Sequence, residues 1–239
     1  MKRLQQSISF FLSFSFLFST NYYVAKDGTV NSDCSQSSPC LHVQTAIDLT
    51  VDGDVVIVSG GTYLENLLIT HAITLKSADP SDPAIIDGSA PDANDWNGSC
   101  IVVKTPNGSS SRITATIEDI EVTGGKGTII KEDSNKNGSF NDPEDISKKV
   151  GGGIIVHHAG LVSRRNKIMN NGDSSTKEGG GLYAAGTGAD VPDPNPNLPP
   201  PDDDERSSIL FEETIFSDND ALVGHTVMVN GWDPENQFI

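Results

Sequence analysis

Short runs of β-branched and aliphatic residues, separated by corners rich in glycine and aspartate, recur along this chain and restrict the folds open to it. The run Val55–Val58 follows a Gly-Asp turn and ends at Gly60-Gly61, after which Thr62 and Tyr63 resume an extended pattern. Periodicity alone does not separate so short a run from a buried helix segment. The β-branched content and the flanking glycines favour a strand. The sequence therefore predicts a fold built from many short strands.

Several other segments have the same character, and we expect strands at residues 22–25, 67–69, 73–75, 84–86, 100–103 and 114–122. Residues 42–50 differ, because Val43, Ala46 and Ile47 stand at helical spacing. This spacing favours one short amphipathic helix over its rival, a loop with a strand. Such a helix is suited to capping the open end of a solenoid.

The second half contains an internal repeat. Gly151–Gly153 followed by IIV is echoed by Gly179–Gly181 followed by LY. The segments VSRRNKIMNNGD (162–173) and LFEETIFSDND (210–220) share an order of apolar residue, spacer, apolar pair and Asn, and TIEDIEVTGG is a weaker copy. Units of a few tens of residues bury too little apolar surface alone, so they stack into a solenoid with parallel strands and inward Asn ladders. A β-sandwich is the rival fold, but hairpin dipeptides do not separate the strands.

Two insertions interrupt the repeating pattern. Residues 126–149 form the first, and residues 189–206, which contain DVPDPNPNLPPPDDDER, form a proline-rich, acidic and extended second. Solenoids tolerate insertions at their corners. We expect one elongated domain over residues 21–239, without a closing cap before Ile239, so that the chain is a fragment of a longer protein or its open end docks on a partner.

The N-terminus has the character of a secretory signal. Lys2 and Arg3 precede the apolar stretch ISFFLSFSFLF, which is too short to span a bilayer, and small residues follow it. We expect residues 1–20 to be a signal peptide, with a buried N-terminal helix as the alternative. No later apolar stretch is long enough for a transmembrane helix, so we expect a secreted, cell-surface or outer-membrane protein.

The charge is strongly negative. Lys and Arg number 16 against 33 Asp and Glu, a formal net charge of −17, and loss of Lys2 and Arg3 with the leader makes it −19. A polyanion repels nucleic acid and anionic lipid, so neither is an expected partner. It also repels an acidic polysaccharide unless cations intervene. Calcium is a natural companion for acidic loops outside the cell.

Three cysteines remain after export. Cys34 and Cys40 lie six residues apart in a polar, turn-rich loop, and in an oxidising compartment they predict a local disulfide that pins this loop. Cys100 opens the run SCIVV and is expected to be an unpaired, buried thiol at the start of a strand.

Four segments, YYVAKDGT, TAIDLTVDGDVVIVSGGTYLENLLI, ITLKSADP and AIIDGS, resemble the start of right-handed parallel β-helix proteins of the pectin-lyase-like superfamily. The GGGI and GGGLY pairs, with FSDN at 216–219, resemble the GGA(I/L) and FxxN repeats of polymorphic outer membrane proteins. The resemblance covers most of residues 22–232. It implies an all-β, right-handed parallel β-helix that is secreted or on the outer surface and acts as an adhesin or polysaccharide binder, sometimes as a polysaccharide lyase.

The first insertion carries a motif for calcium. Residues 133–144 match the pattern D-x-[DN]-x-[DN]-G-x5-E of a twelve-residue calcium loop. Gly138 permits the sharp bend, and the expected ligands are Asp133, Asn135, Asn137, the carbonyl of Ser139 and Glu144. No helices are predicted on either side, so we expect an isolated structural calcium loop, with an ordinary polar surface loop as the alternative.

A lyase would need a basic residue that abstracts the proton next to a uronate carboxylate, aided by bound calcium. Arg164 and Arg165 are the candidates, because they are the only paired arginines on a predicted strand, where one of them points outward. Their alternative role is to offset the acidic field of the surface. His157 and His158 face opposite sides of a strand, one packed and one exposed, and do not chelate one metal together.

The motifs of known lyase families are otherwise missing: neither the RxPxxR pattern of pectate lyases nor the NTD, DD, GHG and RIK set of polygalacturonases is present. The sequence therefore favours a calcium-stabilised, adhesin-like β-helix that binds polysaccharide or a surface protein. A calcium-dependent polysaccharide lyase of the pectate-lyase type is the alternative.

Overall fold

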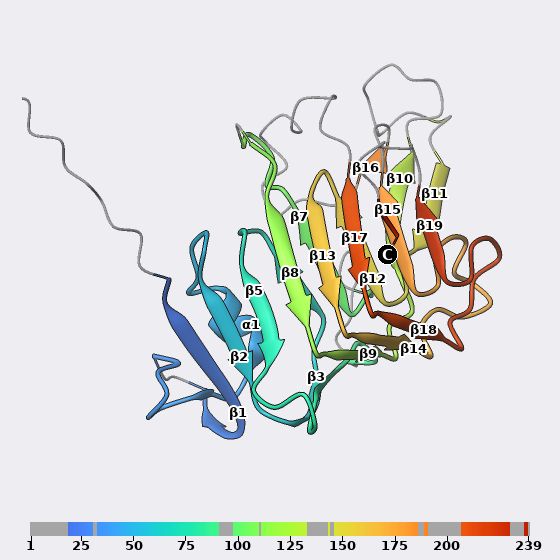
Figure 1. The fold of residues 1–239 in the computed structure, drawn as a ribbon. Helices are drawn as coiled ribbons and strands as arrows, with labels where there is room; N and C mark the ends of the chain where they lie inside the picture. The colour runs from blue at the N-terminus through green and yellow to red at the C-terminus, as the bar shows by residue number, and fades with distance from the viewer. Residues whose placement is uncertain are drawn as a thin grey trace, which may run out of the picture.

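Three parallel sheets surround one core, and the chain visits them in a fixed order (Figure 1). The computed structural model describes residues 19–30, 33–90, 98–109, 111–132, 143, 146–185, 189–190, 207–229 and 237–238. The first sheet has the order β1 (Asn21–Thr29), β2 (Val55–Val58), β5 (Thr74–Ser77), β8 (Thr114–Glu118), β13 (Gly160–Arg164), β17 (Ser208–Glu212) and β20 (Gln237–Phe238).

The second sheet runs β18 (Ile215–Ser217), β14 (Lys167–Met169), β9 (Glu121–Thr123), β6 (Ala84–Asp87) and β3 (Gly61–Leu64). The third runs β19 (Val227–Val229), β15 (Leu182–Ala185), β12 (Ile154–His157), β7 (Ile101–Lys104) and β4 (Leu67–Ile69). Strands from successive turns pair in parallel, as β2 with β5 and β12 with β15. One turn thus passes through all three sheets, and the predicted parallel β-helix is confirmed.

The core is a stack of equivalent side chains from successive coils. In the first sheet Val56, Leu75 and Ile117 stand in register and are buried, and Ser163 and Phe211 continue the same column. Burying each large aliphatic side chain contributes about 1.5–3 kcal/mol. Neighbouring residues of the same strands point outward, so this sheet has an exposed face along its length.

Corners in the left-handed backbone region separate the first sheet from the second. Asp119, Arg165 and Glu213 occupy this position in three successive coils, with φ of 58°, 52° and 52°. The expected single strand over residues 114–122 is therefore wrong: β8 ends before Asp119 and β9 begins after Ile120. The alternation of apolar residues continues across so short a corner, and for this reason the sequence did not show the bend.

The glycine repeats mark where coils approach each other most closely. Gly153 donates its amide to the carbonyl of Gly180 at 3.0 Å, and Ile154 donates to Gly181 at 2.9 Å. A Cβ atom on Gly152 would lie 2.3 Å from the nitrogen of Gly172. The two GGG segments are therefore equivalent corners of neighbouring coils, as the repeat predicted.

Asparagines form a ladder beside these corners. The side-chain amide of Asn171 donates to the carbonyl of Val122 at 2.9 Å and to Oδ1 of Asn219 at 3.0 Å. Asn219 in turn donates to the carbonyl of Ile168 at 2.8 Å. These bonds satisfy backbone groups that the corner leaves without strand partners.

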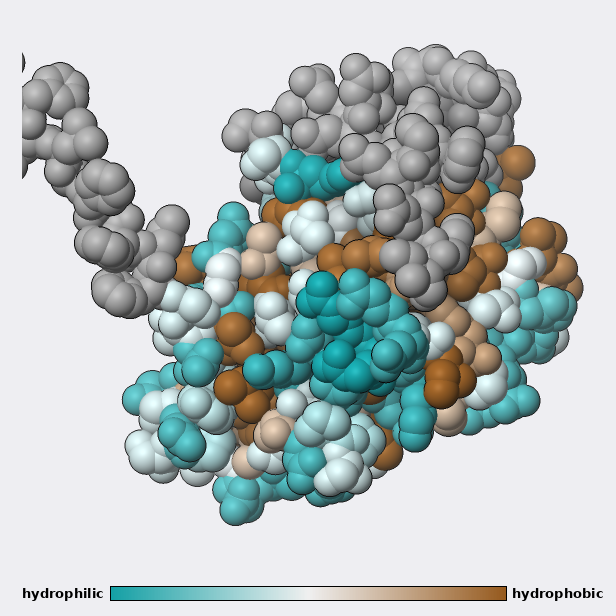
Figure 2. All heavy atoms as spheres, viewed as in Figure 1, coloured by the Kyte–Doolittle hydropathy of each residue, from teal (hydrophilic) through white to brown (hydrophobic). Residues whose placement is uncertain are grey.

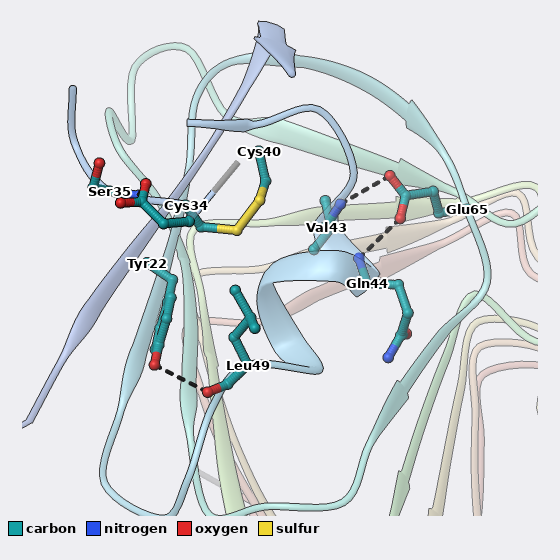
Figure 3. Close-up of a disulfide and its surroundings, with 9 residues drawn as sticks. Tyr22, Cys34, Ser35, Cys40, Val43, Gln44, Leu49 and Glu65 are labelled. Atoms are coloured by element: carbon teal, nitrogen blue, oxygen red, sulfur yellow. Dashed lines mark hydrogen bonds between the residues drawn. A yellow bond between two sulfur atoms is a disulfide. The ribbon is translucent and has the colours of Figure 1, made fainter. Parts of the chain in front are cut away.

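The N-terminal end is capped, as predicted (Figure 3). Helix α1 (Val43–Ile47) lies against β4, and the Gln44 amide both accepts from Leu68 N at 2.8 Å and donates to Leu68 O at 3.1 Å. In Figure 3 the Glu65 carboxylate meets the start of the helix, where it accepts from Val43 N and Gln44 N, each at 3.0 Å. Gln44 thus takes the place of a neighbouring strand at this edge of the third sheet.

The predicted disulfide joins Cys34 to Cys40 in the loop that covers β1 (Figure 3). The amide of Tyr23 donates to the carbonyl of Cys34 at 2.7 Å, and Thr29 donates to Pro39 at 3.0 Å. With this loop beside it, β1 continues to Thr29, beyond the strand predicted at residues 22–25. The loop partners supply the hydrogen bonds that keep those residues extended.

The first insertion is an antiparallel hairpin that packs on the outside of the third sheet. Strands β10 (Thr128–Glu132) and β11 (Ile146–Val150) pair with each other, and β16 (Ala189–Asp190), from the second insertion, pairs with β10. Ile130 and Val150 of the hairpin form a second buried cluster with Val102, Ile155 and Tyr183. The two insertions therefore meet on one side of the solenoid.

Cys100 and the pair His157 and His158 are all buried. Cys100 is a buried free cysteine immediately before β7, as predicted. His157 and His158 are both buried, so the expectation of one exposed ring is wrong. Strand β12 ends at His157, and His158 adopts φ 47° at the corner, so strand alternation does not apply to it.

Candidate binding face

The paired arginines align with paired acids in the coils on both sides. Strand pairing places Arg164 opposite Glu118 in one neighbour and opposite Glu212 in the other. Lys76 pairs with Glu118 one coil further along. We call this row of Lys76, Glu118, Arg164 and Glu212 the charged ladder. It crosses the outer face of the first sheet parallel to the solenoid axis.

Arg164 bridges three coils. Its Nε donates to Oε2 of Glu212 at 2.6 Å and its Nη1 donates to Oε1 of Glu118 at 3.0 Å. These hydrogen bonds, to Glu212 first and then to Glu118, raise the pKa of Arg164 above its ordinary value. With 35% of its side chain exposed, the guanidinium remains in contact with solvent while both of its neighbours hold it.

Arg165 lies at the corner below this row. Its Nε and Nη2 donate to the two oxygens of Asp119, each at 2.8 Å, in the bidentate geometry that suits a carboxylate. The hydrogen bonds to Asp119 raise the pKa of Arg165. The chain turns at this residue, so both arginines reach the same side of the molecule, whereas strand alternation predicted one.

A shallow hollow of about 140 Å³ opens beside Arg165. Charged residues and a proline-containing loop line this hollow. The lining residues are Pro80, Ser81, Pro83, Asp119, Ile120, Glu121, Arg165 and Lys167. The hollow lies where the first sheet turns into the second. It therefore extends the charged ladder around the corner.

A less polar row runs beside the charged ladder on the first sheet. Val55, Thr74, Thr116, Val162 and Leu210 are paired in order and half-buried. Figure 2 shows hydrophilic side chains gathered over the ends of β8, β13 and β17, with hydrophobic ones beside them. The face thus offers fixed charges and apolar contacts side by side on rigid strands.

The acidic partners Glu118, Asp119 and Glu212 did not emerge from the sequence analysis as site residues. The sequence does contain a pattern that relates them: IEDIEV (117–122), SRRNKI (163–168) and FEETIF (211–216) align as copies of one repeat. In that alignment the Glu-Asp and Glu-Glu pairs flank Arg-Arg directly. The repeat thus places these pairs at equivalent positions of neighbouring coils, and the structure shows that their side chains meet.

The expected calcium ligands Asp133, Asn135, Asn137, Ser139 and Glu144 lie outside the described residues, in the segment between β10 and β11. The hairpin strands on either side show that the segment is not flanked by helices, as the sequence predicted. In the described part of the chain no group of three or more His, Cys, Asp or Glu is arranged to hold a metal ion. The calcium site stays a prediction.

Cys100 shows no sign of a reactive thiol. Its Sγ donates to the carbonyl of Thr123 at 3.0 Å, and burial raises its pKa to about 12. A thiol nucleophile needs the opposite shift. Its place among the corner atoms of Gly88 and Gly125 indicates a packing role.

No established protein family matches the sequence. No curated protein matches it either. Among the described residues, no helix has the length and apolar character to cross a membrane.

Two solved structures align with this chain. A GH136 lacto-N-biosidase from Eubacterium ramulus aligns over 83% of this chain and 34% of its own, with 12% identity and a TM-score of 0.39. A pectin methylesterase in complex with a hexasaccharide aligns over 93% of both chains, with 12% identity and a TM-score of 0.30. The chain thus spans about a third of the first enzyme. At these TM-scores the conclusion on fold rests on the sheet topology itself.

Proposed function

We propose that this protein is a secreted or cell-surface β-helix that binds polysaccharide, or a surface protein, along its first sheet and does not cleave it. The observation that carries the proposal is the state of Arg164 and Arg165. Arg164 is held by two carboxylates and Arg165 by one, all from neighbouring coils, and each arginine has a raised pKa. The arginines serve to hold coils in register and to build a binding face.

A lyase base has to accept a proton from the substrate, so it works best when its pKa lies near the working pH. The ion pairs raise the pKa of both arginines further above the working pH. Asp119 also occupies the Nε and Nη2 donors of Arg165 that would contact a uronate carboxylate. The geometry therefore supports binding over elimination chemistry.

Calcium completes the proposal as a structural ion in residues 133–144. The loop is carried by a hairpin whose base is buried against the third sheet, away from the first. In this arrangement the ion orders the insertion and takes no part in ligand binding on the charged ladder.

Incubation with polygalacturonate and millimolar calcium, followed by the absorbance of unsaturated uronates, tests the proposal. We expect no turnover by the wild-type protein. Clear turnover that disappears in Arg165→Ala, and persists in the matched surface variant Lys177→Ala, would establish the lyase instead. Retention of the protein on immobilised polysaccharide, without product release, supports the binding function.

A further inference from the structure

We infer that the charged ladder and its corner bind a neutral polysaccharide rather than an acidic one. This inference rests on the proposed function and names the class of its ligand. The residues that carry it are the charged ladder together with the corner residues Asp119 and Arg165 and the walls of the adjacent hollow.

The two arginines of this face are already neutralised by carboxylates. Arg164 has a carboxylate on each side, at 2.6 Å and 3.0 Å, and Arg165 is saturated on one edge by both oxygens of Asp119. A ligand carboxylate would have to displace an acid that the neighbouring coil holds at a fixed position. The exchange yields no new ion pair, and it leaves the displaced carboxylate without its partner.

The local charge also opposes an acidic ligand. Glu118, Asp119, Glu121, Glu212 and Glu213 outnumber the four cations Lys76, Arg164, Arg165 and Lys167. The chain as a whole carries a formal net charge of −17. A polyuronate therefore approaches a face that carries more negative than positive charges, and the repulsion is strongest at low ionic strength.

What the face offers instead is hydrogen-bond acceptors. Glu118 uses Oε1 and Glu212 uses Oε2 on Arg164, and an ionised carboxylate has about four acceptor positions. Because Arg164 holds both acids in place, little conformational freedom is lost when they accept from a ligand. Sugar hydroxyls are donors that fit such acceptors without bringing charge.

The adjacent row supplies apolar contact. Val55, Val162 and Leu210 are half-buried on the outer face, beside the charged ladder and in register with it. Carbon-bound hydrogens of a sugar ring pack on such surface while its hydroxyls meet the carboxylates. Because both rows repeat from coil to coil, they fit a polymer that runs along the solenoid axis.

Affinity electrophoresis at about 0.01 M ionic strength, where charges act over a Debye length of roughly 30 Å, tests this inference. Separate gels contain a neutral xyloglucan, a neutral galactomannan or polygalacturonate, with and without EDTA. We expect a neutral gel to retard the protein and polygalacturonate not to. Glu212→Gln should weaken the retardation about tenfold, since a charged acceptor is lost.

The matched control is Glu178→Gln, which removes a carboxylate bonded to Lys148 at 2.9 Å on the side of the hairpin. It should bind as the wild type does. Glu118→Gln, on the other side of Arg164, serves as a second binding variant if Glu212→Gln does not fold. Retardation by polygalacturonate alone overturns the inference and leaves polysaccharide binding intact, whereas retardation by none of the gels overturns polysaccharide binding itself.

Discussion

At the scale of single residues, buried polar side chains decide how coils join. Asn171 is fully buried and bonded in all directions: its amide donates to Val122, Met169 and Asn219, and its Oδ1 accepts from Gly125 N at 3.1 Å. A buried polar group with such partners stabilises the fold, and its removal leaves several backbone groups without partners.

Asn171→Ala should lower the free energy of unfolding by about 3 kcal/mol, because buried carbonyls and an amide lose their partners. Urea unfolding followed by circular dichroism measures the change. The neighbouring Asn170 is exposed at φ 55°, so Asn170→Gly should change stability by less than about 1 kcal/mol. Equal midpoints for the two variants would contradict the role assigned to Asn171.

At the scale of elements, strands and corners contribute differently. The strands are short and supply the buried side chains of the core. The corners control how closely neighbouring coils stack. Gly152 illustrates this: a Cβ there would lie 2.3 Å from Gly172 N and 2.5 Å from Gly180 O, both backbone atoms that do not move aside easily. Only glycine fits at Gly152, because the backbones of neighbouring coils approach so closely there.

Gly152→Ala should destabilise the protein by about 3 kcal/mol or more, because the coils on both sides have to separate. Gly53→Ala is the control: its backbone has positive φ, 93°, unlike that of Gly152, but nothing lies within 4 Å of the added Cβ. Backbone strain alone should cost that variant about 1 kcal/mol. Thermal unfolding of both proteins compares them, and a similar loss in each would show that stacking distance is not the constraint.

At the scale of the whole molecule, the solenoid carries an N-terminal cap and a hairpin on one side. The α1 cap and the disulfide loop cover its N-terminal end, and the β10–β11 hairpin covers the outside of its third sheet. Within the described residues the hairpin packs on the third sheet and not on the charged ladder of the first. The calcium prediction concerns the hairpin, at a distance from that face.

Calcium should stabilise the protein by about 1.4 kcal/mol at a free concentration tenfold above a millimolar dissociation constant. The melting temperature in calcium and in EDTA measures this, and limited proteolysis shows whether residues 133–145 are protected. Asp133→Asn combined with Glu144→Gln should abolish both effects, whereas Asp79→Asn, in another exposed loop, should retain them. Identical melting curves with and without calcium would argue against the site.

The sequence by itself determined the coil: the strands at Val55–Val58 and Leu67–Ile69, the glycine corners, the capping helix and the disulfide follow from local composition and short spacing. Only the tertiary structure decided which side chains of different coils meet. Arg164 lies 48 residues from Glu212 and 46 from Glu118. Insertions of unequal length conceal that period, so a pair of apparently free arginines became a neutralised ladder only when the coils were stacked.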